Sequence, residues 1–504
     1  MEIFAFVLYF VLMLGIGFFF FFKEKNSNGE KDYFLGGRQM GPWVTAMSAQ
    51  ASDMSAWLLM GLPGSILAFG LGQAWIGIGL ALGTIANWLF IAKRLRKFSK
   101  AANDSITLPQ YLSNRFVTGG KALQIICAII FLVFFTVYVA SSFVAGTDVF
   151  TTVFPSLDRM TAMIIFAAII LIYTFLGGFK AVCWTDFFQG MLMLFALLAV
   201  PIVILAAKNL DTSALNTAYS YVENGSTVDT VFKTSFFSAT PQEIISGLAW
   251  GLGYFGMPHI LVRFMSIKKA SMVKKSATIA IIWVILTLGA SMLLAYLGRM
   301  IIGDGAIAEK LLTAGKQKMV FIELARGMFP TFIAGLLMAA IIAASMSTAD
   351  SQLLVASSSF TSDIYHPVIR KNASDKEILW VGRIVVLIVA VVAFFIASSK
   401  AKGAQAIMDM VENAWGGFGS AFGPVVILSL FWKRLTYKGA IAGVIGGAVV
   451  DVVWMFCLSG PTGIYELAPG FLFGLICAVV VSLLTKAPGK EVEELFDKAV
   501  NYTE

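Results

Sequence analysis

Charged side chains are scarce in this sequence. Asp, Glu, Lys and Arg make up 13% of the 504 residues, whereas 58% are hydrophobic and the mean hydropathy is +0.83. A soluble globular domain carries roughly 25% charged residues, because its surface has to face water. The composition therefore excludes a soluble protein and predicts an all-α polytopic membrane protein.

Residues that bind metals or haem are also few. The two histidines, His259 and His366, exclude a multi-histidine site, and the cysteines lack metal-ligand spacing. The run Gly251-Leu-Gly-Tyr-Phe-Gly256 matches the dinucleotide fingerprint letter by letter, but it lies in an apolar run and not after a strand. We therefore expect no cofactor and no enzymatic activity. We expect small apolar core residues at the four cysteines, Cys127, Cys183, Cys457 and Cys477.

Long apolar runs, in contrast, recur along the whole chain. A helix of about 20 residues crosses the hydrocarbon core of a bilayer, and about thirteen runs reach that length. The first lacks a preceding basic stretch, so we expect a span and not a signal peptide. The predicted spans are 3–22, 42–69, 72–92, 123–151, 160–178, 187–207, 241–265, 276–299, 319–349, 378–398, 405–432, 438–458 and 464–485.

The positive charges predict an orientation. Of the 37 Lys and Arg residues, 27 fall in alternate loops that become cytoplasmic if the N-terminus is outside and the C-terminus inside. The net charge of +8 is thereby dispersed over many short loops, so we expect no nucleic-acid partner.

Two runs contain helix breakers, Gly61-Leu-Pro-Gly64 in the second and Gly256-Met-Pro258 in the seventh. Paired interrupted helices are typical of secondary transporters, and a repeat with an odd number of helices has to invert its second copy. The predicted parts are the first span with a cytoplasmic loop (1–41), a first five-helix repeat (42–208), an external loop with a short surface helix (209–240), a second, inverted repeat (241–432), two further spans (433–486) and a cytoplasmic tail (487–504).

Polar residues interrupt the second run. Ser48, Gln50, Ser52, Asp53 and Ser55 lie in a segment otherwise apolar enough to cross a bilayer. Such residues at membrane depth usually face a cavity that binds something polar. The alternative is a helix start near the lipid headgroups.

Hydroxyl groups on the ninth run suggest what is bound. Ala344, Ser347 and Thr348 lie at i, i+3 and i+4, on one helix face. Together with carbonyls from an unwound turn at 51–55, they would form an all-oxygen site for a monovalent cation such as sodium; a divalent ion would be expected to need more carboxylates. Alternatively, both hydroxyls bond back to their own helix or join two helices.

The seventh run offers groups for an organic substrate. Trp250, Tyr254, Met257 and Pro258 lie at i, i+4, i+7 and i+8, which predicts one aromatic-rich helix face. Since Pro258 has no N–H to donate, we expect the carbonyl of Tyr254 to be free. The alternative is ordinary aromatic packing. Asp186 is predicted at a cytoplasmic boundary, where it could act in a gate or in coupling.

Several sequence motifs of this chain resemble those of a known family. Asp32-Tyr-Phe-Leu-Gly-Gly-Arg38, the run 52–64, the run 250–260 with Arg263 beyond it, Met346-Ser-Thr348 and Trp415-Gly-Gly-Phe-Gly-Ser-Ala-Phe-Gly-Pro424 closely resemble the proline-transporting members of the solute:sodium symporter family. The resemblance implies a thirteen-span, inverted five-helix-repeat (LeuT-like) protein of the bacterial cytoplasmic membrane that couples inward sodium flow to L-proline uptake.

The same resemblance implies site residues. Sodium would be held by the carbonyls of Ala51, Met54 and Ala344 with the hydroxyls of Ser347 and Thr348, and Asp53 would be linked to sodium-dependent function. Coupling residues would be Arg38 and Asp186. Substrate or gate positions would be Ser55, Ala56, Trp57, Tyr138, Trp250, Tyr254, Met257 and Pro258.

Two residues beside the implied substrate pocket depart from the family pattern: Ala56 replaces Gly, and Met257 replaces Gln. A different small zwitterion or carboxylate therefore stays open as the substrate. The alternative from another functional class is a channel, which would conduct its substrate without accumulating it against a gradient.

Overall fold

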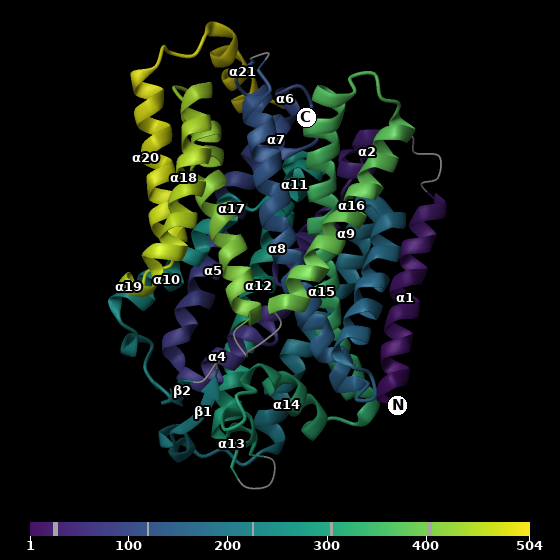
Figure 1. Ribbon diagram of the computed structural model, residues 1–504, viewed down its shortest axis with the longest axis vertical. Coiled ribbons are helices and arrows are strands. Elements are labelled where there is room, and N and C mark those ends of the chain that lie inside the picture. The colour runs from purple at the N-terminus through teal and green to yellow at the C-terminus, as the bar shows by residue number, and fades with distance from the viewer. Residues whose placement is uncertain (24–28, 118–119, 224–225, 303–305, 401–405, 504) are drawn as a thin grey trace.

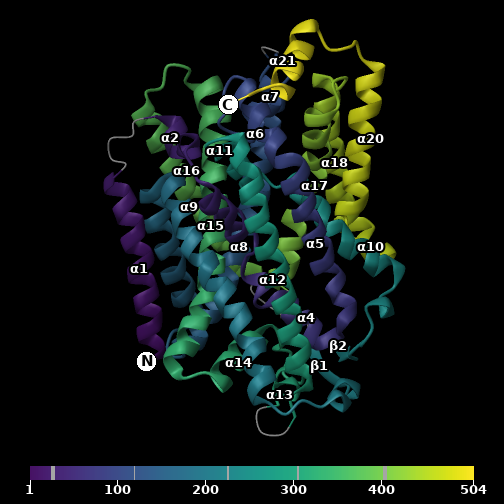
Figure 2. The same cartoon turned by 180° about the vertical axis from the view of Figure 1, so that it is seen from behind.

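The computed structural model describes residues 1–504 except 24–28, 118–119, 224–225, 303–305, 401–405 and 504. The described helices stand side by side in one upright bundle, and the two termini lie at its opposite ends (Figures 1 and 2). Opposite ends are what an odd number of spans requires. Backbone groups in a bilayer have to be paired within the segment, which explains why helices dominate.

The first half of the bundle contains α1 (Glu2–Lys23), α2 (Glu30–Leu35), α3 (Pro42–Asp53), α4 (Gly61–Phe69), α5 (Ala74–Ala86), α6 (Ala92–Ala101), α7 (Leu108–Asn114), α8 (Ala122–Val153) and α9 (Arg159–Ala207). The second half contains α10 (Pro241–Ala249), α11 (Pro258–Ser266), α12 (Val273–Met300), α13 (Ile307–Leu312), α14 (Val320–Met328), α15 (Thr331–Phe360), α16 (Asp375–Lys400) and α17 (Ala406–Phe431). Four helices complete the chain: α18 (Tyr437–Cys457), α19 (Ser459–Thr462), α20 (Leu467–Leu484) and α21 (Lys490–Val500).

Ten helices of the described part are long and apolar enough to cross a membrane, or eleven if the bent pair Pro241–Phe255 and Pro258–Ser266 is one span. Two further predicted spans coincide with shorter apolar helices, Ala56–Phe69 and Arg159–Ile172. The polytopic all-α class is thus confirmed, while thirteen spans stay a prediction.

The loop predicted between 178 and 187 is reduced to a break at Gly178. This residue adopts φ 61° and ψ −177°, which is not helical, so the segment Arg159–Ala207 consists of two helices that meet at Gly178. A positive φ is readily available to glycine alone, so one residue suffices to redirect the helix. The predicted fifth and sixth spans are therefore two helices, as expected, but they are joined at Gly178 without the predicted loop.

Other boundaries also differ. The ninth span starts at Thr331 and not at 319, because a break at Phe329-Pro330 separates it from α14. The external loop 209–240 carries two short 3-10 turns, Thr212–Asn216 and Phe236–Ser238, and an antiparallel hairpin that was not predicted, β1 (Tyr219–Glu223) with β2 (Ser226–Thr230). The tail does form the expected helix, α21.

α15 is the most enclosed long helix and packs against α8, α9 and α3. At the other side of the bundle, α18 and α20 pack on α17 (Figure 1). Small residues permit these close approaches, as at Gly447, where an added Cβ would lie 2.0 Å from the Ser420 carbonyl oxygen. Cys127 and Cys183 are buried as predicted, but Cys457 is exposed and Cys477 half-exposed, because they lie on the outer helices α18 and α20.

Candidate transport site

The second apolar run is broken, next to the unwound turn predicted at 51–55. The predicted breaker Gly61-Leu-Pro-Gly64 does not interrupt a helix, because it forms the first turn of α4. α3 ends at Asp53, and Met54 (φ −82°, ψ 75°) and Ser55 (φ −60°, ψ −173°) leave the helical conformation. The Ser55 hydroxyl then accepts a hydrogen bond from the backbone N–H of Trp57 at 3.5 Å. A short polar side chain that pairs with nearby backbone competes with the helix, which explains why the break occurs here.

The seventh run is broken as well. A 3-10 segment, Trp250–Phe255, lies between α10 and α11, and the two arms are bent by 42°. A 3-10 helix has three residues per turn, so the predicted single α-helical face through Trp250, Tyr254 and Met257 is wrong. Pro258 stands in the first turn of α11, where its missing N–H costs little.

The Tyr254 carbonyl is not free, contrary to prediction. It accepts a hydrogen bond from Asn87 Nδ2 at 3.0 Å. Asn87 belongs to the π-helical segment Asn87–Ile91 between α5 and α6, and it therefore occupies the carbonyl that Pro258 leaves without a helical donor.

The two breaks meet in the interior. The Tyr254 hydroxyl donates to Asp53 Oδ2 at 2.5 Å, and the rings of Trp57 and Trp250 lie 6.3 Å apart. Trp415 of α17 completes the contact, because its indole N–H donates to the Trp250 carbonyl at 2.8 Å. Asp53, Trp57, Trp250 and Tyr254 are each at most 3% exposed, so this cluster is closed to solvent.

The remaining predicted substrate positions surround the same cluster. Ser55, Ala56, Met257, Pro258 and Tyr138 are all buried. The Tyr138 side chain, from α8, approaches Ser55 and Asp53, and its ring lies 6.4 Å from that of His259. The substrate positions drawn from three segments of the sequence thus come together in space.

The predicted cation ligands lie on α3 and α15. The Ser347 hydroxyl donates to the Ala51 carbonyl at 2.8 Å and lies 3.2 Å from the Ala344 carbonyl. Thr348 is fully buried, and its hydroxyl has no hydrogen-bond partner in the described part of the chain. Met54 is likewise buried at the end of α3. Gly190 permits the close approach of α9, since an added Cβ would lie 3.2 Å from Ala51 Cβ.

Asp186 does not lie at a solvent boundary. It is fully buried in the second arm of α9, where its Oδ2 accepts from the Ser48 hydroxyl at 2.6 Å and from Arg263 at 3.0 Å. Arg263 also donates to Ser48 and Ser351. Sequence reasoning gave Arg263 no role; its isolation in the apolar run Ile260-Leu-Val-Arg-Phe-Met was the available signal.

Arg38 is buried at the end of the bundle where α2 meets α6 and α11. It donates to Asp104 Oδ1 at 2.8 Å, to the Met265 carbonyl at 2.5 Å and to the Ser105 carbonyl at 2.6 Å. Lys31 and Lys100 also pair with Asp104. Burial opposes ionisation of Asp104, but these lysines and Arg38 together hold its pKa below the usual value.

Comparison with known proteins identifies related chains. The sodium/proline symporter of Haemophilus influenzae is 44% identical over 99% of this chain and 97% of its own length. The sodium/proline symporter of Escherichia coli is 43% identical (98% and 95%), and the osmoregulated proline transporter OpuE of Bacillus subtilis is 41% identical (97% and 96%).

Solved structures share the fold. A Na+-coupled sialic acid symporter in a substrate-bound, outward-open state matches with a TM-score of 0.72 at 20% identity, over 97% of this chain and 99% of that one. Mhp1, a nucleobase-cation-symport-1 family transporter, matches with a TM-score of 0.53 at 13% identity, over 94% and 98%. The sodium:solute symporter pattern matches residues 33–447, and the chain therefore belongs to the sodium:solute symporter family of multi-pass membrane transporters.

Proposed function

We propose that this protein is a secondary active transporter that couples inward sodium flow to the uptake of L-proline by alternating access, and not an enzyme. The observation that carries the proposal is the meeting of both broken helices at Asp53 and Tyr254, beside the contact of Ser347 with the Ala51 carbonyl. Relatives at 41–44% identity over nearly the full chain are named as proline carriers.

In this proposal sodium is a co-substrate and no further cofactor takes part. The carbonyls of Ala51, Met54 and Ala344 and the hydroxyls of Ser347 and Thr348 hold the ion. The Thr348 hydroxyl, which has no hydrogen-bond partner among the described residues, supports this assignment, because a buried hydroxyl without a partner costs free energy unless something binds it.

Proline occupies the enclosure bordered by Ser55, Ala56, Trp57, Tyr138, Trp250, Tyr254, Met257 and Pro258. Its ring would pack against the aromatic and apolar side chains, and its ammonium and carboxylate groups would bind the polar side chains. Asp53 contributes through its bond to Tyr254, which ties the ion-bearing helix α3 to the substrate-bearing segment 250–255. Ion binding to α3 would thereby order the substrate-bearing segment 250–255.

Alternating access needs the buried cluster to open on each face in turn. With the N-terminus outside and the C-terminus cytoplasmic, the Arg38–Asp104 network lies at the inner face, and we assign Arg38 and Asp186 to coupling. A membrane potential of 100 mV supplies about 2.3 kcal/mol per charge. A tenfold sodium gradient adds about 1.4 kcal/mol, so one sodium ion supports roughly 500-fold accumulation.

Uptake of labelled proline into proteoliposomes under an imposed sodium gradient tests the proposal. We expect accumulation that saturates and collapses when the sodium gradient is dissipated. Equal uptake with a sodium-free proton gradient would overturn the choice of cation, and flux without accumulation would favour a channel. Inhibition of proline uptake by other small zwitterions and carboxylates tests which substrate is preferred. This test is needed because Ala56 and Met257 depart from the family pattern beside the proposed substrate site.

A further inference from the structure

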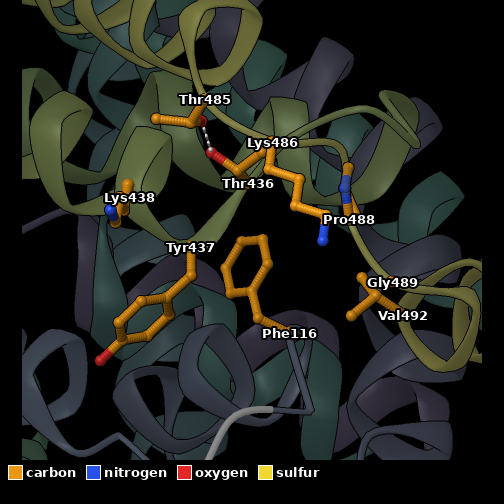
Figure 3. Close-up of a pocket in the computed structure, with 9 residues that line it drawn as sticks. All are labelled: Phe116, Thr436, Tyr437, Lys438, Thr485, Lys486, Pro488, Gly489 and Val492. Atoms are coloured by element: carbon orange, nitrogen blue, oxygen red, sulfur yellow. Dashed lines mark hydrogen bonds between the residues drawn. The ribbon is translucent and has the colours of Figure 1, made fainter.

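A cavity of about 240 Å³ opens at the end of the bundle where α18 begins and α20 ends (Figure 3). Phe116, Tyr437 and Val492 form apolar walls, and Lys438, Lys486 and Gly489 stand around the rim. The threonines at its back, Thr436 and Thr485, pair with each other at 3.0 Å. None of these residues belongs to the proposed transport site.

The cavity is basic. None of its lining residues is acidic, and neither Lys438 nor Lys486 has an ion-pair partner within the described residues, although both are exposed. Figure 3 shows the Lys486 side chain reaching across the opening, with its amine near the Phe116 ring, while Lys438 stands beyond Tyr437 at the opposite edge. The two lysines thus stand on different sides of the opening.

Two arginines reinforce the positive charge from behind the wall. Arg434 donates to the Thr485 carbonyl at 2.8 Å, and Arg115 donates to the Val492 carbonyl at 3.3 Å. Each has a second terminal guanidinium nitrogen, Nη1 of Arg434 and Nη2 of Arg115, that is buried without a partner among the described residues. A guanidinium group with unused donors is suited to phosphate oxygens.

Two acidic residues of the neighbouring helix α21 pair with a different lysine. Glu493 and Asp497 of α21 both pair with Lys433, at 3.9 and 2.7 Å, and Lys433 does not line the cavity. The basic groups around the cavity thus have no neutralising partner from these two carboxylates.

Apolar surface adjoins the same opening. Leu483 and Leu484, at the last turn of the membrane-spanning α20, are 59% and 81% exposed. Side chains exposed to this degree at the end of a span face lipid. A ligand with an anionic head and hydrocarbon tails would satisfy both the basic cavity and this apolar flank.

We propose that the cavity binds the headgroup of an anionic phospholipid, with its phosphate between Lys438 and Lys486 and its acyl chains along the end of α20. In the orientation proposed above, the lipid belongs to the cytoplasmic leaflet, where anionic lipids attract basic groups. The site is an anchoring surface separate from sodium and substrate binding.

Native mass spectrometry of the purified full-length protein, titrated with phosphatidylglycerol, tests this assignment without sodium or proline. The double variant Lys438→Gln/Lys486→Gln should bind about 30-fold more weakly, since each lysine near a lipid headgroup contributes about 1 kcal/mol. The matched control, Lys268→Gln/Lys269→Gln, removes two exposed lysines elsewhere and should bind as the unmodified protein does.

Three results would overturn the proposal: the same loss in both double variants, equal binding of phosphatidylcholine, or displacement of the lipid by inorganic phosphate at millimolar concentration. The last result would indicate a site for a free anion. Failure of proline uptake would leave the lipid titration unaffected, so the two proposals fail separately.

Discussion

Three buried polar contacts in this protein join different helices. Asp53 pairs with Tyr254, Ser347 with the Ala51 carbonyl, and Asp186 with Arg263. Polar groups at membrane depth are costly without partners, so each of these bonds fixes two helices relative to each other. An ion that enters between α3 and α15 would replace the Ser347 bond with stronger ion–oxygen contacts.

The two hydroxyls of α15 give a direct prediction for sodium affinity. Ser347→Ala combined with Thr348→Ala removes two proposed ligands and should raise the sodium concentration for half-maximal proline uptake by roughly tenfold or more, since bonds to a charged group contribute about 1.5–3 kcal/mol each. Uptake measured over a sodium series supplies the value. Ser345→Ala is the control, because Ser345 only bonds back to the Ile341 carbonyl at 3.0 Å. An unchanged half-maximal concentration would remove Ser347 and Thr348 from the site.

The buried Asp186–Arg263 pair predicts an effect on stability. Arg263→Ala leaves the Asp186 charge without its cation and should lower the free energy of unfolding by about 3–5 kcal/mol. Adding Asp186→Asn removes that charge and should restore part of the loss. Thermal unfolding of the purified variants measures both effects. Equal melting temperatures for the Arg263 variant and the unmodified protein would contradict the pairing.

At the scale of elements, the second broken helix is held by close contacts at its 3-10 segment 250–255. An added Cβ at Gly83 of α5 would lie 2.3 Å from the Gly251 carbonyl oxygen, and one at Gly253 would lie 2.0 Å from Trp415 Nε1. Cβ atoms do not approach other atoms this closely, so the 3-10 segment 250–255 can pack here only because Gly83, Gly251 and Gly253 have no side chain. Packing therefore keeps Tyr254 in reach of Asp53.

This packing predicts contrasting effects of two glycine substitutions. Gly83→Ala should displace segment 250–255 and lower both the melting temperature and proline uptake, the latter by at least tenfold. Gly289→Ala should be neutral or stabilising by up to about 1 kcal/mol, because nothing lies within 4 Å of its added Cβ and alanine favours a helix. Matched melting and uptake curves test the pair. Similar behaviour of the two variants would show that the α5 contact does not control the site.

At the scale of the whole molecule, the termini lie at opposite ends, so one end of the bundle faces outward. The hairpin β1–β2 and the tail helix α21 also lie at opposite ends (Figure 1). The distribution of Lys and Arg predicts that the hairpin is outside and the tail is cytoplasmic. In that orientation the basic cavity and the Arg38 network would share the inner face.

Cysteine labelling in intact cells tests that orientation. In a background without the four native cysteines, Ser226→Cys in β2 should react with a membrane-impermeant maleimide, whereas Lys498→Cys in α21 should react only after permeabilisation. Both positions are exposed in the structure, so burial does not protect either one. Labelling of the tail from outside, with protection of the hairpin, would reverse the orientation.

Local chemistry in the sequence specifies the class of the protein and the positions of both breaks. Low charge and long apolar runs require a helical membrane protein. Ser55 at the first break, and Gly256 and Pro258 at the second, interrupt helices through their local backbone chemistry. The family motifs then pointed to residues on separate segments. Because these signals are local, no tertiary contact was needed to detect them.

How those segments join depends instead on the packed molecule. The bond of Asn87 to the Tyr254 carbonyl, the 3-10 geometry of 250–255 and the burial of Asp186 against Arg263 all require contacts between residues far apart in sequence. The direct junction of the two helices of α9 depends on one glycine conformation that hydropathy does not detect. Hydropathy and local spacing report on one helix at a time, whereas these features arise where helices meet.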